Sequence, residues 1–135
     1  MVTSLLEAYG AAERIFKIED TLPETEEPVH PVTCGEIRTI EFKNVSFAYP
    51  DTERKILEHF NYVIHKGDQI GIAGESGAGK STLLRLLLRF YAPSEGQILI
   101  NGIPLEQISF SELHKRIAFL EQDTYLFDMT IGENI

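Results

Sequence analysis

The sequence predicts an α/β fold that is organised around a phosphate-binding loop. Three observations support this prediction. Residues 74–81 fit the pattern G-x-x-x-x-G-K-[ST], a short apolar run typical of a strand comes before them, and a leucine-rich helical run comes after them. Strand, glycine-rich loop and helix in this order are the context in which this pattern binds phosphate.

Composition limits the classes of function. The chain has 135 residues, 43% of them hydrophobic, which fits one globular domain with a sizeable core. The formal net charge of −9 argues against a nucleic acid or an anionic membrane surface as the main partner, because both favour a basic face. Cys34 is the single cysteine, so an internal disulfide is impossible. We expect neither a secretory signal nor a membrane-spanning helix in this sequence.

The N-terminal part is predicted to be a helix followed by a tether. An amphipathic helix over residues 4–18 is indicated by apolar residues at helical spacing, Leu5, Tyr9, Ala12 and Phe16. Residues 22–31 combine three prolines with three glutamates and show no apolar periodicity, which predicts an extended, solvated linker. Because a strand-like pattern begins directly afterwards, we place a domain boundary near residues 33–35.

Strands are predicted on the N-terminal side of the loop. Alternation between apolar and polar residues predicts one or two strands over residues 37–49 and another over residues 56–64. Residues 69–73 are short and apolar, which predicts a strand that leads directly into the loop.

The loop is predicted to open a helix. The leucine-rich run at residues 83–90 indicates a helix that packs on a sheet, with Arg85 and Arg89 on its solvent-facing side. Residues 97–100 are predicted to form a strand that ends at the tight turn of Asn101 and Gly102.

A second short helix and a further strand are predicted near the C-terminal end of the sequence. Ser109 and Glu112 fit a capping box, in which each side chain bonds a backbone N–H of the other, and this opens a helix that runs to Arg116. Residues 117–120 are apolar and are predicted to form a strand.

The residue types of the loop suit a triphosphate. Its glycines allow backbone N–H groups to approach the phosphate oxygens closely. Lys80 places a positive charge near the β- and γ-phosphates, the Ser81 hydroxyl is a ligand for Mg²⁺, and the following helix directs its positive dipole end at the anion. Thr82 adds a hydroxyl at the rim. The predicted binding residues of the loop are Gly74, Glu75, Ser76, Gly77, Ala78, Gly79, Lys80, Ser81 and Thr82.

Three further motifs accompany the loop. Residues 41–50 are E-F-K-N-V-S-F-A-Y-P, residues 91–102 are Y-A-P-S-E-G-Q-I-L-I-N-G, and residues 121–127 are E-Q-D-T-Y-L-F. Together they resemble the nucleotide-binding domain of an ATP-binding cassette (ABC) transporter of the exporter type, in which membrane and nucleotide domains are fused. The three segments are similar to its aromatic adenine-stacking loop, its hairpin after the phosphate-loop helix, and its glutamine loop. Residues 130–135 continue the likeness, which covers nearly the whole chain.

The resemblance implies roles for two residues outside the phosphate loop. Tyr49 matches the aromatic residue that stacks on adenine, a contact of about 1–3 kcal/mol by analogy with base stacking. The other interpretation of Tyr49 is a strand-end aromatic that seals the core. Gln122 matches the glutamine that reaches Mg²⁺ or the attacking water. The implied catalytic residues are therefore Lys80 and Gln122, and the implied metal-binding residues are Ser81 and Gln122. The other interpretation of Gln122 is a solvated polar residue, and Glu121 departs from the proline that the family often has there.

The resemblance also implies a fold and partners. The fold is that of a P-loop NTPase of the ABC type, here in part, with an antiparallel β subdomain beside a parallel core. Residues 1–35 correspond to the linker helix and acidic tether from a membrane domain, and residues 36–135 to the N-terminal part of the nucleotide-binding domain. The implied ligands are ATP and Mg²⁺. The implied partners are the membrane domain and a second nucleotide-binding domain, in a homodimer or heterodimer at the cytoplasmic face of a membrane.

The implied activity is ATP hydrolysis that powers export of an unidentified substrate. The Walker B strand, the L-S-G-G-Q signature and the switch histidine of the family do not occur in this sequence. We therefore expect the isolated chain to bind Mg·ATP weakly and not to hydrolyse it. Two other classes stay open: a soluble, non-transport P-loop or ABC ATPase, and a non-catalytic nucleotide-binding module. Apolar residues also follow the glutamine loop, namely Tyr125, Leu126, Phe127 and Met129. They indicate either a docking surface for the membrane domain or ordinary core.

Overall fold

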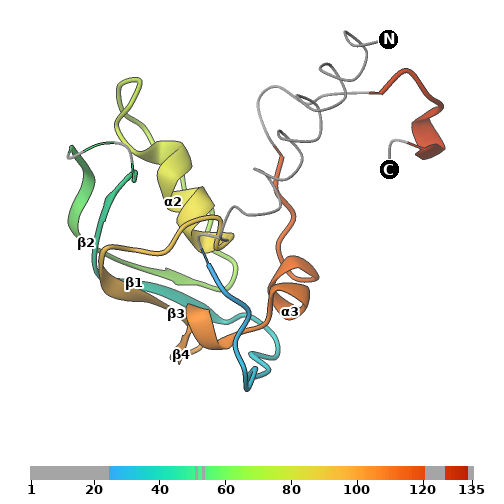
Figure 1. Ribbon diagram of the computed structural model, residues 1–135, viewed down its shortest axis with the longest axis horizontal. Coiled ribbons are helices and arrows are strands. Elements are labelled where there is room, and N and C mark those ends of the chain that lie inside the picture. The colour runs from blue at the N-terminus through green and yellow to red at the C-terminus, as the bar shows by residue number, and fades with distance from the viewer. Residues whose placement is uncertain (1–24, 51, 53, 121–126, 134–135) are drawn as a thin grey trace, which may run out of the picture.

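The computed structural model describes residues 25–50, 52, 54–120 and 127–133. Its centre is a four-stranded sheet with the spatial order β2-β1-β3-β4 (Figure 1). The strands are β1 (Thr39–Ala48), β2 (Lys55–His65), β3 (Glu95–Ile100) and β4 (Ile103–Pro104). The described helices are α2 (Lys80–Leu87), α3 (Phe110–His114) and the 3-10 helices η1 (Leu105–Gln107) and η2 (Ile131–Glu133). Among these residues, none of the helices has the length and apolar character needed to cross a lipid bilayer.

The sheet confirms the two strands that alternation predicts before the phosphate loop and the strand predicted over residues 97–100. All of its pairings are antiparallel, and β1 lies between β2 and β3. The tight turn predicted at Asn101 and Gly102 joins β3 to β4, and the two residues have positive φ values of 52° and 80°, as such a hairpin requires.

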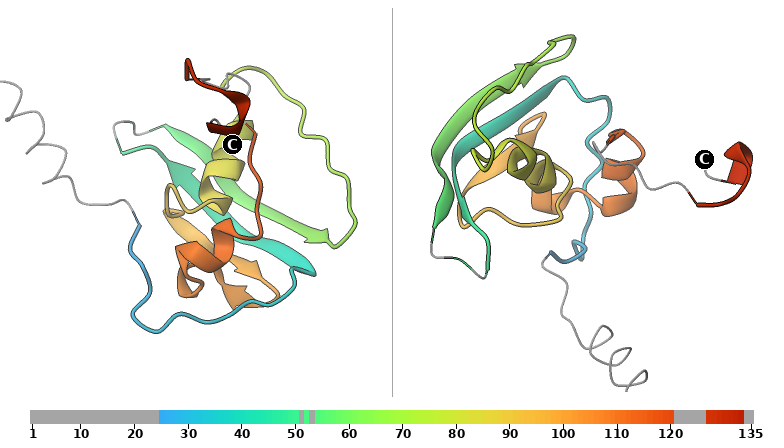
Figure 2. Two further views of the ribbon diagram at one scale, coloured as in Figure 1. Left: turned by 90° about the vertical axis from the view of Figure 1, so that its right-hand side faces the viewer. Right: turned by 90° about the horizontal axis from the view of Figure 1, so that it is seen from above.

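The hydrophobic core lies between the sheet and the two α-helices. Figure 2 shows α2 against the concave face of the curled sheet. Leu86 of α2 and Leu113 of α3 are fully buried there against strand residues such as Val45 and Ile98. Burial of one such side chain stabilises the fold by about 1.5–3 kcal/mol. This packing holds α2 in place and thereby positions the phosphate loop that precedes it.

Two predicted strands are not formed in the described residues. Residues 69–73 and 117–120 lie outside the sheet, and no described segment pairs with them. Ile70 and Ile72 remain 40% and 47% exposed and line an apolar cavity of about 300 Å³. Apolar composition alone predicts these strands wrongly, because a strand also needs a neighbouring backbone for its N–H and C=O groups. The expected parallel core is accordingly not among the strands described.

Helix α2 begins at Lys80 and ends three residues before the predicted end, residue 90. Arg89 adopts a left-handed conformation, with φ of 59°, and its N–H bonds the carbonyl of Leu86. The N–H of Phe90 bonds the carbonyl of Arg85, which completes a Schellman motif. This turn directs Arg89 into the protein, where it is only 5% exposed. The prediction of a solvent-facing Arg89 is wrong for this reason.

Arg89 joins the described part of the predicted tether to the helical layer. Its guanidinium donates hydrogen bonds of 2.5 Å to the carbonyls of Ile108 and Glu26, and it lies 4.2 Å from the centre of the Phe110 ring. The Thr25 hydroxyl donates a 2.6 Å bond to the Arg89 carbonyl. Burial lowers the pKa of the guanidinium, and nearby carboxylates oppose that shift.

Residues 25–34 have further attachments to the helical layer. The Glu27 carboxylate accepts a 3.0 Å bond from the N–H of Phe110 at the start of α3, and Val32 donates a 2.7 Å backbone bond to Gln107. Cys34 is buried in the core with 6% exposure. The described part of the predicted linker is therefore attached to the domain by these bonds, although most of its residues are exposed, as predicted.

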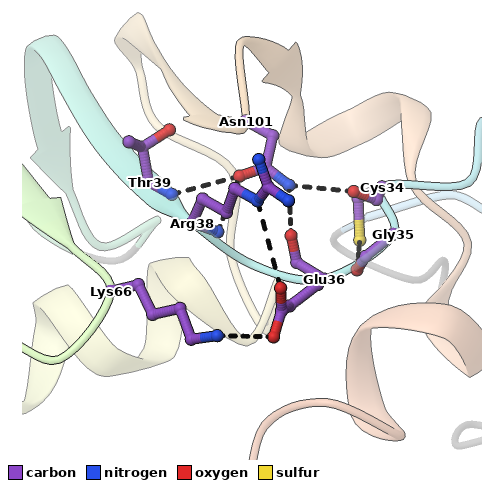
Figure 3. Close-up of polar contacts among 7 residues, drawn as sticks. All are labelled: Cys34, Gly35, Glu36, Arg38, Thr39, Lys66 and Asn101. Carbon is purple, nitrogen blue, oxygen red and sulfur yellow. Dashed lines mark hydrogen bonds and ion pairs between the residues drawn. The ribbon is translucent and has the colours of Figure 1, made fainter.

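Asn101 fastens the end of this segment to the sheet (Figure 3). Its amide oxygen accepts bonds from the N–H groups of Arg38 and Thr39, at 2.8 and 3.1 Å. Its amide nitrogen donates to the carbonyls of Cys34 and Glu36, at 2.9 and 2.7 Å. One side chain in the β3–β4 turn thus holds four backbone groups that lie before and within the start of β1.

Replacing Asn101 with alanine is expected to lower the free energy of unfolding by about 1–3 kcal/mol. Four backbone groups lose a partner, and alanine is strained at a φ of 52°. Denaturant titration of the purified protein measures the change. The Asn101→Gly variant is the matched control, because it loses the same bonds without the strain and should be about 1 kcal/mol more stable than the alanine variant. An alanine variant as stable as the wild type would contradict this role.

Candidate functional site

The phosphate loop ends in a tight turn at the start of α2. Gly79 precedes the helix with φ of 86°, and a Cβ at this position would lie 3.1 Å from the Ile56 side chain and 3.3 Å from its carbonyl oxygen. Because the capping residue Gly79 has no side chain, no side-chain cap bonds the first turn of α2, and this turn carries no acidic residue. Its N–H groups and the positive end of the helix dipole are therefore suited to an anion.

Lys80 supplies a positive charge at this helix end. Its ammonium donates hydrogen bonds to the carbonyls of Gly74 and Glu75, at 2.8 and 2.6 Å, so the side chain lies back across the loop. An ammonium group has three donors and no acceptor, which suits phosphate oxygens. Ser81 is exposed beside it, and its hydroxyl oxygen is the type of ligand that Mg²⁺ prefers.

A cavity of about 490 Å³ lies over the loop and the first turn of α2. Its volume is within the usual range for small-molecule sites, about 300–1,000 Å³. The lining consists of Tyr49, Ile56, Ser76, Gly77, Gly79, Lys80, Ser81 and Thr82. All of these except Ile56 are predicted from the sequence. Gly74, Glu75 and Ala78 belong to the same loop but are not part of the lining.

Tyr49 follows the last residue of β1 and is held in an aromatic cluster. Its ring centre lies 5.0 Å from that of Phe47 and 5.1 Å from that of Tyr91, with interplanar angles of 80° and 89°. Edge-to-face pairs of this kind contribute about 0.5–1.5 kcal/mol beyond their buried area. The ring packs on the core, which agrees with the second interpretation of Tyr49, and it also lines the cavity. Stacking on adenine stays a prediction.

The Tyr49 hydroxyl is attached to α2. It lies 3.1 Å from the hydroxyl of Thr82 and accepts a 3.2 Å bond from the guanidinium of Arg85. Thr82 is only 4% exposed, so it lies deeper than the rim position predicted for it. Arg85 is exposed, as predicted. Its contact with Tyr49 was not predicted. Arg85 lies three residues after Thr82, so the two side chains share the face of α2 that meets Tyr49.

The structure leaves one predicted site residue without a position. Gln122 lies outside the described residues, as do Glu121, Tyr125 and Leu126. Phe127 and Met129 are described and are 59% and 58% exposed, so the interpretation of these two as ordinary core is wrong within the described chain.

The sequence and the fold of this chain are similar to those of known proteins. One family model, described as ABC transporter, matches residues 57–134. A probable ABC transporter ATP-binding/permease protein of Haemophilus influenzae is 40% identical over 133 residues, which is 98% of this chain and 24% of the relative. An uncharacterized ABC transporter ATP-binding protein of Bacillus subtilis is 40% identical over 98% of this chain and 22% of the relative.

A solved structure is similar as well. It is described as a bacterial Atm1-family ABC exporter with ATP bound, and it matches 97% of this chain with a TM-score of 0.79 and 35% sequence identity. The match covers 23% of that exporter chain. The present chain therefore spans about a quarter of the length of each of these three proteins.

Proposed function

Because this chain belongs to the ABC transporter family, we propose that it binds ATP, with the triphosphate in the loop and the adenine base on Tyr49. The observation that carries the proposal is one cavity where Tyr49, the loop and the first turn of α2 meet. A flat aromatic face and an uncapped helix N-terminus with a lysine suit the two ends of a nucleotide. The similar exporter structure, described with ATP bound, supports the same assignment.

The proposed roles follow from the donor groups. Backbone N–H groups of the loop, residues 74–79, wrap the phosphates. Lys80 exchanges the carbonyls of Gly74 and Glu75 for the β- and γ-phosphate oxygens. We propose Ser81 and Gln122 as the residues that would hold Mg²⁺, which supplies positive charge at the phosphates when bound. Gln122 is also proposed to orient the attacking water.

For the complete protein we propose ATP hydrolysis that powers export of a substrate across a membrane. The relative from H. influenzae is described as an ATP-binding/permease protein, which supports the fusion of nucleotide and membrane domains. We assign residues 1–35 to the linker from the membrane domain and residues 36–135 to the N-terminal part of the nucleotide-binding domain. The proposed partners are that membrane domain and a second nucleotide-binding domain, at the cytoplasmic face of the membrane.

The Lys80→Ala variant tests this function. In the complete protein it is expected to raise the dissociation constant for Mg·ATP by at least about tenfold and to abolish ATP hydrolysis, because the phosphates lose a charge-assisted donor. Calorimetric titration and phosphate release measure the two effects. Lys66→Ala is the control, because Lys66 is an exposed lysine that pairs with Glu36 away from the cavity. Wild-type protein that binds no Mg·ATP, or a Lys80 variant that binds it normally, would refute the proposal.

A further inference from the structure

The phenol of Tyr49 is held at both ends of its ring. The body of the ring lies edge-to-face against Phe47 and Tyr91, while the hydroxyl contacts Thr82 and Arg85 of α2. The residue itself lies beyond the last residue of β1, so no strand pairing of its own fixes the side chain. The contacts at the hydroxyl therefore add a constraint that the strand does not provide.

The chemistry of the groups gives the bond between Arg85 and Tyr49 a direction. A guanidinium has donors only, so the Tyr49 oxygen accepts the bond from Arg85. The phenol proton is then available to the oxygen of Thr82, which lies 3.1 Å away. A positively charged donor strengthens the next bond in such a chain by polarising the hydroxyl between them. The bond from Arg85 to Tyr49 thus has a fixed direction, whereas either hydroxyl can donate in the bond between Tyr49 and Thr82.

This chain connects the two halves of the proposed nucleotide site. Thr82 is in the first turn of α2, beside Lys80 and Ser81, whereas Tyr49 follows the end of β1, and all of them line the cavity. A ring that is already oriented loses less conformational freedom when a flat ligand stacks on it, so orientation in advance raises affinity. This gain in affinity applies only to a ligand that contacts the Tyr49 ring.

We infer that Arg85 is a positioning residue for the base-binding half of the site: through the Tyr49 hydroxyl it holds the ring ready for a purine or similar flat ring. This inference rests on the proposed binding of ATP and adds a residue that the site itself does not contain, because Arg85 does not line the cavity. In this inference, Arg85 acts on the base through Tyr49.

Two ligands separate the base-binding half from the phosphate-binding half. In the complete protein, Mg·ATP and Mg·tripolyphosphate are titrated into the wild type and into Arg85→Met, Tyr49→Phe and the double variant. Phenylalanine keeps the stacking face and removes only the hydroxyl. Each single variant is expected to bind Mg·ATP about fivefold more weakly, the loss of one net hydrogen bond. Tripolyphosphate affinity is expected to change by less than about twofold, because this ligand has no base.

The double variant and a control complete the test. If Arg85 acts only through the Tyr49 hydroxyl, the double variant binds Mg·ATP about as weakly as either single variant, rather than about 25-fold more weakly. Arg38→Met is the control, because Arg38 is an arginine with a 76% exposed side chain that lies outside the cavity, and it should change neither affinity.

The outcomes separate this inference from the function on which it rests. A wild type that binds both ligands, together with an Arg85→Met variant that binds Mg·ATP normally, overturns the inference and leaves the function standing. Equal weakening of both ligands, or additive losses in the double variant, overturns it too, since Arg85 would then act on the loop or independently of Tyr49. A wild type that binds neither ligand overturns both.

Discussion

The Gly96→Ala variant is expected to lose more than about 3 kcal/mol of folding free energy and to accumulate largely as unfolded or aggregated protein. Gly96 lies in β3 with φ of 79°, a conformation that costs an alanine about 1–2 kcal/mol by itself. A Cβ here would also overlap the carbonyl oxygens of Lys43 and Asn44 in β1. These oxygens belong to the backbone, so no change of side-chain rotamer relieves the overlap.

The place of this overlap explains the size of the effect. The register between β1 and β3 is irregular between Lys43 and Ser46, and Asn44 has a positive φ of 52°, so β1 bulges toward Gly96 at this point. Moving the bulge away would disturb the pairing of β1 with both of its neighbours. The whole sheet is therefore affected by one added methyl group.

A matched glycine separates the two causes. Gly102 has almost the same φ, 80°, but a Cβ there would meet no atom within 4 Å. Gly102→Ala should therefore lose only about 1–2 kcal/mol, the conformational part alone. Soluble yield and denaturant midpoints of the two variants give the comparison. Equal losses at both positions would show that the overlap with β1 does not matter.

The Arg89→Met variant is expected to lower the free energy of unfolding by about 2–4 kcal/mol. Methionine preserves much of the aliphatic stem but leaves the carbonyls of Ile108 and Glu26 without the guanidinium that bonds them. The contact with the face of Phe110 is lost as well. Denaturant titration measures the loss, and limited proteolysis tests whether residues 25–34 become easier to cleave.

Arg89→Lys separates charge from shape. Lysine keeps the positive charge, but it lacks the planar fork that reaches two carbonyls and stacks on a ring. The lysine variant should therefore lie between methionine and the wild type in stability. A methionine variant within about 0.5 kcal/mol of the wild type, the usual range for surface substitutions, would mean that Arg89 does not anchor the segment.

The parts of the fold that depend on local sequence pattern could be predicted. Alternation over β1 and β2, the turn at Asn101 and Gly102, and the cap at Ser109 all have a local physical cause, and they are present. Only the Ser109 half of the predicted capping box is among the described bonds, and α3 ends at His114, two residues before the predicted end. The Ser109 hydroxyl accepts a bond from the N–H of Glu112 at 3.2 Å. The resemblance to the ABC family, which depends on motifs, is confirmed by the match over residues 57–134.

The parts that depend on distant partners could not be predicted. Residues 69–73 have the composition of a strand but no described neighbour to pair with. Arg89 follows the helical pattern of its neighbours, and only its left-handed backbone turns it toward Ile108 and Glu26. A sequence pattern does not contain these partners, which are 19 and 63 residues away along the chain.

The candidate site shows the same division. The loop could be predicted from a short motif and Tyr49 from the resemblance to a family, and Tyr49 and most of the loop line one cavity. The contact between Arg85 and the Tyr49 hydroxyl joins residues 36 positions apart and became visible only with the fold. The role of Gln122 and the helix over residues 4–18 stay predictions, because both lie outside the described residues.

The docking of residues 25–34 has a practical consequence for anyone who wishes to produce the nucleotide-binding part as a recombinant protein. A gene trimmed to begin at residue 36, where the strand pattern starts, would omit the Glu26 carbonyl that Arg89 bonds and the Glu27 carboxylate at the first turn of α3. It would also omit the buried Cys34 and open the core to solvent. The trimming site should therefore lie upstream of Thr25.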